Sequence, residues 1–150
     1  MIVDTIDGDL ITIFKEGKGH IIHGCNCSHI MGAGLAKQIR DNFFGAYVAD
    51  TMTKKGKEKL GSNSVYTHPT IGNMIFNAYT QGSLGETIIE ADHIRKCFRS
   101  AVVSIILVNE GLPLYTPKIG AGIAGCSWED IYEVIDEATG TYPVIAVRKR

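Results

Sequence analysis

Short, mainly apolar runs alternate with amphipathic stretches along this 150-residue chain. The segments 20–25 and 73–79 are rich in apolar and β-branched residues, which is typical of strands buried inside a sheet. Alternation or β-rich composition predicts further strands at 2–6, 10–14, 65–68, 112–117 and 142–147. Pro113 and Pro117 place one of these strands near an edge or an end of the sheet, because proline cannot donate to a strand ladder.

Four other segments have the pattern of helices. Apolar residues recur at helical spacing in 35–43, 88–106 and 128–138, with polar residues on the opposite face. A capping box from Ser127 to Asp130 opens the last helix, and Gly140 closes it. The segment 46–60 also looks helical, and its lysines are interpreted as a solvated face rather than a phosphate-binding patch: Lys54, Lys55, Lys57 and Lys59.

The order of these elements predicts the fold class. Strands and helices alternate, which favours a three-layer α/β/α architecture around a central, mostly parallel sheet. Two strands in direct succession, 2–6 and 10–14, argue for a mixed rather than a purely parallel sheet. The length suits one domain over residues 1–150, and no linker or repeat divides it.

Composition and charge exclude several classes of function. A net charge of −1 gives no sign of a nucleic-acid surface. No apolar run approaches the length of a membrane span, and the start lacks the pattern of a signal peptide. The four cysteines do not form the framework of a secreted domain, so a reduced, cytoplasmic location is expected.

The cysteines also raise the question of a metal. His23, Cys25 and Cys27 would project to one face of a strand at period two. A structural zinc needs a fourth ligand, and no second cysteine pair follows at the usual spacing. Buried thiols are therefore the preferred interpretation, and neither a metal nor another cofactor is expected.

Two glycine-rich turns, each between a predicted strand and a predicted helix, are the main candidates for ligand binding. The first contains Gly32-Ala33-Gly34, and the second runs from Ile119 to Gly125. Glycine lets backbone N–H groups approach a ligand closely, and the start of a helix attracts anions. Two such turns suggest one ligand with several anionic groups.

The second turn matches the dinucleotide fingerprint Gly-x-Gly-x-x-Gly, but a Rossmann oxidoreductase is disfavoured. That fingerprint normally opens the first βαβ unit, whereas here it lies in the last one. The strand that follows ends in Arg148-Lys149-Arg150 instead of the carboxylate that binds ribose. A Walker motif is absent, so kinase or ATPase chemistry has no support.

Two polar residues precede the first turn, and each has two interpretations. His23 is either a core histidine bonded to the backbone or a general base at the mouth of a phosphate pocket. Asn26 suits a tight turn, and its amide equally suits a ribose hydroxyl beside a phosphate-binding loop.

Taken together, the motifs resemble the macro domain, the module that binds ADP-ribose. The resemblance covers nearly the whole chain and rests on four stretches: 8–10, 23–27 with 32–36, 77–81, and 119–125 with Trp128. The start His-x-Cys-Asn-Cys is most similar to the branch of the ADP-ribose-1''-phosphate phosphatases. The terminal ADP-ribose protein glycohydrolases form a closely similar branch.

The resemblance implies a role for each motif. Asp9 would accept the adenine amino group, Asn26 would hold the distal ribose, and the first turn would face that ribose. The second turn would wrap the diphosphate with backbone N–H groups. The ligand-binding residues implied are Asp9, Leu10, Asn26, Gly32, Ala33, Gly34, Thr80, Gln81, Ile119, Gly120, Ala121, Gly122, Ile123, Ala124 and Gly125.

The implied activity is hydrolysis of the terminal phosphate of ADP-ribose-1''-phosphate, with His23 and Asn26 as catalytic residues. His23 would orient or deprotonate the attacking water, and its carboxylate partner stays open among Glu86, Glu90 and Asp92. The alternatives are a non-catalytic reader of ADP-ribose and a glycohydrolase. The glycohydrolase branch uses a lysine and an aspartate, which this sequence lacks at the matching positions.

The partners implied are ADP-ribose or its 1''-phosphate, with ADP-ribosylated macromolecules as a further class. A monomer is expected.

Overall fold

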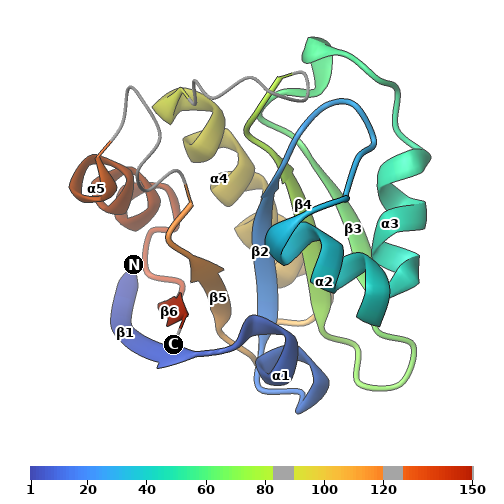
Figure 1. Cartoon of the computed structure of the whole chain (residues 1–150). Coiled ribbons are helices and arrows are strands. Elements are labelled where there is room, and N and C mark those ends of the chain that lie inside the picture. The colour runs from blue at the N-terminus through green and yellow to red at the C-terminus, as the bar shows by residue number, and fades with distance from the viewer. Residues whose placement is uncertain (83–89, 120–126, 150) are drawn as a thin grey trace.

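The computed structural model describes residues 1–82, 90–119 and 127–149, and its centre is one six-stranded sheet (Figure 1). The strand order is β1-β6-β5-β2-β4-β3. The strands are β1 (Ile2–Gly8), β2 (His20–Cys25), β3 (Asn63–Thr67), β4 (Met74–Tyr79), β5 (Leu114–Pro117) and β6 (Val144–Lys149). The α-helices are α1 (Leu10–Lys15), α2 (Gly34–Asn42), α3 (Phe44–Thr51), α4 (Ala91–Val108) and α5 (Trp128–Ala138), and a 3₁₀ turn, η1, spans Lys57–Lys59.

The sheet is mixed and mostly parallel, as the sequence predicts. β3 pairs antiparallel with β4, and the other four pairings of neighbouring strands are parallel. β5 lies between β2 and β6, so the expectation of an edge position for it is wrong. Its prolines are tolerated because Pro113 precedes the strand and Pro117 ends it.

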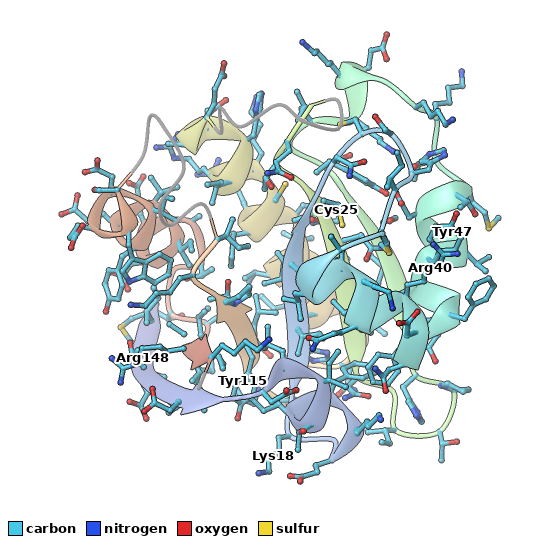
Figure 2. The ribbon with its side chains drawn as sticks, viewed as in Figure 1. Lys18, Cys25, Arg40, Tyr47, Tyr115 and Arg148 are labelled. Atoms are coloured by element: carbon cyan, nitrogen blue, oxygen red, sulfur yellow. The ribbon has the colours of Figure 1, made fainter. Side chains whose placement is uncertain are left out.

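Helices cover both faces of the sheet and give the predicted three layers. Ile21 of β2 packs in a buried cluster with residues of α1, α2 and α3. The next residue, Ile22, faces the other way and packs with residues of α4 and α5. Successive residues of a strand point to opposite faces, so β2 contributes to both cores. Between the helices of the first face, the Arg40 guanidinium lies 4.5 Å from the ring centre of Tyr47 (Figure 2).

The strand predicted at 10–14 is wrong, because this segment is helix α1. Asp9 caps the helix, since its carboxylate accepts a hydrogen bond from the Thr12 backbone N–H at 3.1 Å. The buried residues are two adjacent pairs separated by the exposed Thr12, which is helical spacing: Leu10, Ile11, Ile13 and Phe14. A five-residue apolar run fits either element, and the cap decides it.

The helix predicted over 46–60 is shorter than expected. α3 ends at Thr51, and Gly56 has a φ of 125°, which a continuous helix does not allow. Lys54, Lys55 and Lys57 are exposed, but the solvated face does not include Lys59. The side chain of Lys59 is 10% exposed, and its Nζ lies 3.8 Å from the carboxylate of the buried Asp50.

The remaining predicted elements are confirmed with shifts at their ends. α5 begins after Ser127, whose hydroxyl accepts from the Asp130 N–H, and Gly140 follows its end with a φ of 58°. None of the helices in the described ranges is both long and apolar enough to cross a membrane. The ends of β1, β2 and β4 lead into Asp9 and the segments 26–33 and 80–82, where the predicted ligand residues lie.

Candidate functional site

A cavity of about 510 Å³ opens at the carboxyl end of β2. It brings together much of the predicted distal-ribose site, from His23 and Asn26 to the first glycine turn and Gln81. Its lining consists of His23, Gly24, Cys25, Asn26, Ile30, Gly32, Ala33, Leu35, Ala36 and Gln81. We call it the distal cavity.

A second cavity, of about 170 Å³, surrounds Asp9. We call it the Asp9 cavity, and its lining is Gly8, Asp9, Leu10, Leu35, Gln38, Pro117, Val147 and Lys149. Leu35 at the start of α2 lines both cavities. The two cavities therefore adjoin at α2, and we refer to them together as the cleft, with the Asp9 carboxylate at one end and the loop of Asn26 at the other.

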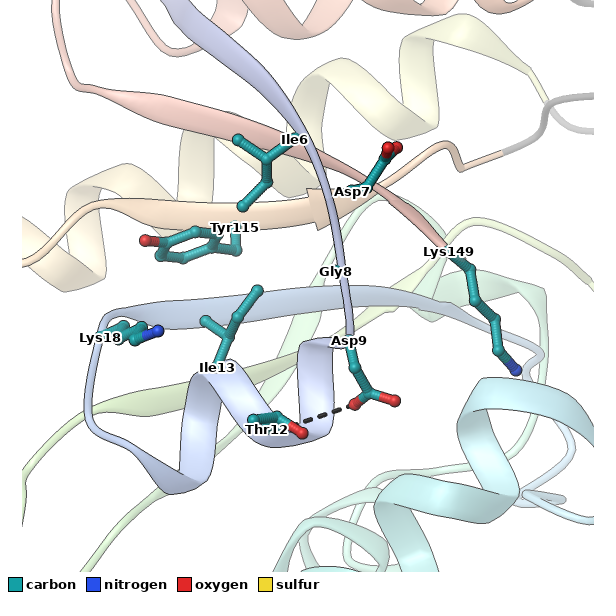
Figure 3. Close-up of a pocket in the computed structure, with 9 residues that line it drawn as sticks. All are labelled: Ile6, Asp7, Gly8, Asp9, Thr12, Ile13, Lys18, Tyr115 and Lys149. Carbon is teal, nitrogen blue, oxygen red and sulfur yellow. Dashed lines mark hydrogen bonds between the residues drawn. The ribbon is translucent and has the colours of Figure 1, made fainter.

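A third cavity, of about 480 Å³, lies on the other side of Asp9 (Figure 3). Ile6, Ile13 and Tyr115 form its apolar part. It shares Gly8, Asp9 and Lys149 with the Asp9 cavity. Asp9 thus lies between the Asp9 cavity and this third cavity. The dashed line in Figure 3 marks its hydrogen bond to the Thr12 backbone.

Asn26 shapes the first glycine turn through both ends of its amide. Its Nδ2 donates to the Ile30 carbonyl at 2.9 Å, and its Oδ1 accepts from the Ser28 N–H at 2.9 Å. Each end of the amide can form one more hydrogen bond, because the nitrogen has two hydrogens and the oxygen has two lone pairs. Asn26 can therefore hold its loop and still contact a ligand.

The loop after Asn26 is also fixed from outside. The Cys27 N–H donates to the Gly82 carbonyl, and the Cys27 carbonyl accepts from the Gly56 N–H at 3.1 Å. His29 has a left-handed φ of 59°, and its Nε2 lies 3.2 Å from the Thr53 hydroxyl. Two separate segments, 53–56 and 81–82, thus hold the loop in place.

His23 is buried in the floor of the distal cavity, and its Nε2 lies 2.7 Å from Asn77 Oδ1. Asn77 Nδ2 donates to the carbonyl of Ala46 and to the Ser64 hydroxyl, both at 2.9 Å. A carbonyl can only accept, so this contact fixes the orientation of the Asn77 amide. Nε2 of His23 consequently carries the proton, and Nδ1 carries the lone pair.

Burial also fixes the charge of His23. Desolvation lowers its pKa to about 4, against smaller opposing effects of Asn77 and Asp50. The imidazole is therefore neutral at pH 7. The thiol of Cys25 lies 3.7 Å from Nδ1, and burial raises the pKa of Cys25 well above its usual value, so this thiol stays protonated.

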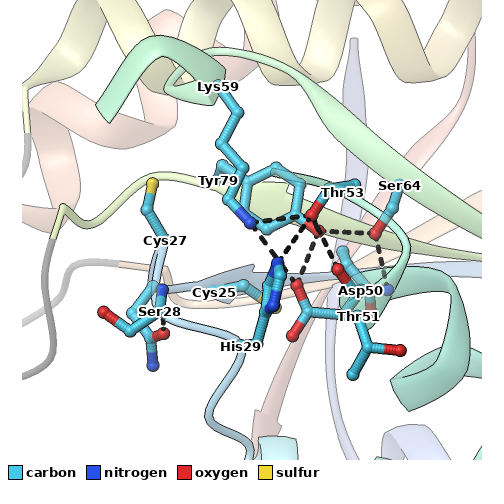
Figure 4. A network of polar contacts seen from close by, with 12 residues as sticks. Cys25, Cys27, Ser28, His29, Asp50, Thr51, Thr53, Lys59, Ser64 and Tyr79 are labelled. Atoms are coloured by element: carbon cyan, nitrogen blue, oxygen red, sulfur yellow. Dashed lines mark hydrogen bonds and ion pairs between the residues drawn. The ribbon is translucent and has the colours of Figure 1, made fainter. Parts of the chain in front are cut away.

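A buried polar network continues from Asn77 toward α3 (Figure 4). The Ser64 hydroxyl lies 2.7 Å from the Tyr79 hydroxyl, which donates to Asp50 Oδ1 at 2.7 Å. Lys59 Nζ lies 4.1 Å from the ring centre of Tyr79 and donates to Thr53 at 2.8 Å. A carboxylate with 1% exposure is thus compensated by one cation and a tyrosine.

This network does not follow from the sequence pattern. Asn77 is predicted only as part of a strand, and Asp50 and Lys59 as part of a polar helix. The available signal was polar residues inside mainly apolar strands, but their partners come from segments far apart in the chain.

Thr80 is buried directly beneath Gly24. A side-chain carbon built on Gly24 would lie 2.9 Å from the Thr80 hydroxyl, so only glycine fits there. That hydroxyl has no hydrogen-bond partner within the described ranges. Ile119 packs on the same glycine and is buried in the core. The remaining predicted residues of the second turn, Gly120 to Gly125, lie outside the described residues.

The three carboxylates offered as partners of His23 differ in position. Glu86 lies outside the described residues. Glu90 lies 3.8 Å from His93, and Asp92 pairs with Arg95 and Lys96 at 3.1 Å, all around the first turns of α4. Neither Glu90 nor Asp92 lines the distal cavity. Over residues 1–82, 90–119 and 127–149, no group of three acidic, histidine or cysteine side chains is placed to hold a metal.

No protein-family model matches the chain. The uncharacterized 17.5 kDa protein in the tk-vs intergenic region of Enterobacteria phage T4 is 34% identical over 161 residues, covering 98% of this chain and 96% of that protein.

Two solved structures have the same fold. The macrodomain of Thermus aquaticus DarG has a TM-score of 0.76 at 20% identity and covers 100% of this chain and 99% of its own. Thermosipho africanus DarTG in complex with ADP-ribose has a TM-score of 0.74 at 18% identity, covering 99% of this chain and 42% of its own. The chain thus belongs to the family of the 17.5 kDa protein of phage T4, and its fold is that of a macro domain.

Proposed function

We propose that the cleft binds ADP-ribose, with adenine in the Asp9 cavity and the distal ribose in the distal cavity. The observation that carries this proposal is that the two cavities adjoin at Leu35. Together they offer one ligand an acceptor for the adenine amino group at Asp9 and an amide for ribose hydroxyls at Asn26. The choice of ligand is supported by a protein that has this fold over 42% of its length and was solved in complex with ADP-ribose.

The diphosphate would lie between these ends. Gly32 and Gly34 stand at the start of α2, where free backbone N–H groups and the helix dipole favour anions. Gly34 adopts a φ of 57° with no atom within 4 Å of the position of a side-chain carbon. The second turn, Gly120 to Gly125, is proposed to complete the diphosphate site.

We further propose hydrolysis of the terminal phosphate of ADP-ribose-1''-phosphate at the distal end. Water attacks phosphorus, the bond from phosphorus to the 1''-oxygen breaks, and ADP-ribose and inorganic phosphate are released. A pKa of about 4 makes His23 a weak base at pH 7. Its proposed role is accordingly to orient the water as an acceptor, with Asn26 holding the ribose.

A non-catalytic reader of ADP-ribose is the second candidate function. One observation favours it: among the described residues that line the distal cavity, there is no carboxylate and no lysine. A cavity with this lining would bind ADP-ribose without hydrolysing it, because a hydrolase needs a group that activates water.

Three measurements on pure protein separate these proposals from each other and from a glycohydrolase. Calorimetry should detect ADP-ribose binding at least about tenfold tighter than AMP, because AMP leaves the distal cavity empty. Equal affinities would refute the cleft assignment. Phosphate release from ADP-ribose-1''-phosphate should be detectable and should fall in His23→Ala. Tight binding without phosphate release identifies a reader, and release of ADP-ribose from a modified protein identifies a glycohydrolase.

A further inference from the structure

The third cavity, beside Tyr115, has no part in the proposed cleft, and the fold explains why it exists. On one face of the sheet, α2 and α3 cover β2, β3 and β4, and the six-residue α1 reaches β5. Toward β1 the same face is less covered, so that Ile6 and Ile145 are only partly buried. The cavity measures about 480 Å³. This volume is within the roughly 300–1,000 Å³ of small-molecule pockets.

Tyr115 of β5 lines the third cavity with a hydroxyl that has no partner. The residue is only 8% exposed, and its hydroxyl makes no hydrogen bond with any residue of the described ranges. The hydroxyl of a tyrosine this buried usually bonds to the protein. The ring packs against Gly19, where a side-chain carbon would lie 2.6 Å from a ring carbon. The ring is therefore held in place, and its hydroxyl can donate to a ligand in the cavity.

Lys18 supplies a cation near that hydroxyl. Its ammonium lies close enough to Tyr115 for an electrostatic interaction, and both residues lie at the same end of the third cavity (Figure 3). Lys18 Nζ also lies 2.9 Å from the carboxylate of Glu16, but the two side chains are 59% and 49% exposed, and such a pair contributes little. An ammonium beside a free hydroxyl donor suits an anionic oxygen group.

The rest of the third cavity is apolar near the ring of Tyr115 and negatively charged farther away. Ile6 and Ile13 line it beside the ring. The two carboxylates of the lining, Asp7 and Asp9, lie away from Lys18 (Figure 3). Because like charges repel, an anionic ligand is oriented with its charge toward Lys18 and its apolar part against the two isoleucines.

We propose that the third cavity is a second binding site, for a small aromatic ring that carries a phosphate or carboxylate group. The ring packs against Ile6, Ile13 and Tyr115, and the anionic oxygens accept hydrogen bonds from Lys18 and from the Tyr115 hydroxyl. The observation that carries this proposal is a nearly buried hydroxyl without a partner, beside a cation, at the end of an apolar cavity. None of these four residues lines the cleft, so the site does not depend on ADP-ribose binding.

Phenyl phosphate is the probe, and the amide NMR shifts of the protein measure its binding. We expect saturable shifts at Tyr115 and Ile13 with a Kd of about 1 mM, since the probe is small. Inorganic phosphate lacks the ring and benzyl alcohol lacks the charge, so each should bind at least about tenfold more weakly. Benzoate carries a carboxylate on the same ring, and the tighter of benzoate and phenyl phosphate identifies the anionic group that the site prefers.

Four variants test the residues assigned to the anion. Tyr115→Phe keeps the ring and should weaken phenyl phosphate binding at least about threefold, and Lys18→Met should weaken it at least about fivefold. Glu16→Gln removes the carboxylate that competes for Lys18 and should tighten binding about twofold. The matched control is Lys15→Met, which removes the same charge from a side chain that bonds to Asn42 outside the cavity and should change nothing. Circular dichroism checks that all four variants keep the fold.

Saturating ADP-ribose separates this site from the cleft. Phenyl phosphate should bind equally well with and without ADP-ribose, and its displacement would place it in the cleft and overturn the proposal. If ADP-ribose does not bind, the proposed function fails, and the comparison of Lys18→Met with Lys15→Met still decides this one. The proposal is also overturned if neither phenyl phosphate nor benzoate gives saturable shifts up to about 20 mM, or if Lys15→Met and Lys18→Met weaken binding equally.

Discussion

Nε2 of His23 lies 2.7 Å from Oδ1 of Asn77, and the two residues face each other in register across β2 and β4. Asn77 in turn faces Ser64 of β3, so three polar side chains cross the sheet in one buried row. The row fixes the tautomer of the histidine and directs the lone pair of Nδ1 away from Asn77. It also connects the floor of the distal cavity to Asp50.

His23 should make the protein less stable in acid. The pKa of His23 is about 4 in the folded protein and near 6.5 when unfolded, so only the unfolded chain gains a proton between these values. The contribution of His23 is fully present above pH 6.5 and declines as the pH falls, by up to about 3 kcal/mol at pH 4.

Urea unfolding at several pH values measures this decline. His23→Gln keeps an amide that can donate to Asn77 but does not titrate, so its stability should fall less between pH 6.5 and pH 4. Burial also lowers the pKa of His20, which adds a smaller slope of the same sign to both proteins. Identical slopes for the two proteins would contradict the burial of a neutral His23.

Removing the cation beside Asp50 should be costly. Lys59→Met leaves a carboxylate of 1% exposure without its cation, and a loss of about 3 kcal/mol or more is expected. Asp50→Asn combined with Lys59→Met should recover much of that loss, because the amide can still accept from Tyr79 and carries no charge. Thermal unfolding of the two variants beside the wild type decides it. A Lys59→Met protein as stable as wild type would mean that Lys59 is solvated after all.

The two roles of Asp9 should separate by substitution. Asp9→Ser keeps a capping oxygen for the Thr12 N–H, so stability should change by less than about 0.5 kcal/mol. The shorter side chain does not reach an adenine amino group, and ADP-ribose affinity should fall about tenfold. Asp9→Ala is the control that should lose both, with a stability loss of about 1 kcal/mol. Unchanged ADP-ribose affinity in Asp9→Ser would remove Asp9 from the adenine site.

Asn26 should act through the order of its loop as well as through direct contact. Asn26→Ala removes both loop hydrogen bonds, and amide hydrogen exchange at Ser28 should accelerate while ADP-ribose affinity falls at least about tenfold. Asn26→Asp retains the acceptor for Ser28 and loses the donor to Ile30, so its exchange rate should lie between those of wild type and Asn26→Ala. Exchange that is the same in all three proteins would argue against this function of Asn26.

The order of the elements could be predicted from the sequence because, in most of them, apolar residues recur at the spacing of a helix or a strand. The segment 10–14 could not, since four apolar residues around Thr12 fit a strand as well as a short helix, and the cap at Asp9 resolves it. The burial of Lys59 could not be predicted for another reason. Its burial depends on Asp50, on Tyr79 and on a chain reversal at Gly56, none of which follows from local charge density.

The candidate site was partly predictable on the same grounds. Asp9 and Asn26 line the cleft because they directly follow strands whose positions the pattern gives, and the first glycine turn lies at the start of the predicted helix. The contact of the two cavities at Leu35 and the row from His23 to Ser64 depend on how separate segments pack. A single sequence can show polar residues within apolar strands, but it does not show which residues they contact.

The most direct test of the proposed cleft is a crystal structure of the protein with ADP-ribose. We expect adenine against Asp9 and Leu35, and the distal ribose against Asn26 and Gly32. ADP-ribose bound in the third cavity, beside Tyr115, or with its adenine in the distal cavity, would contradict this assignment.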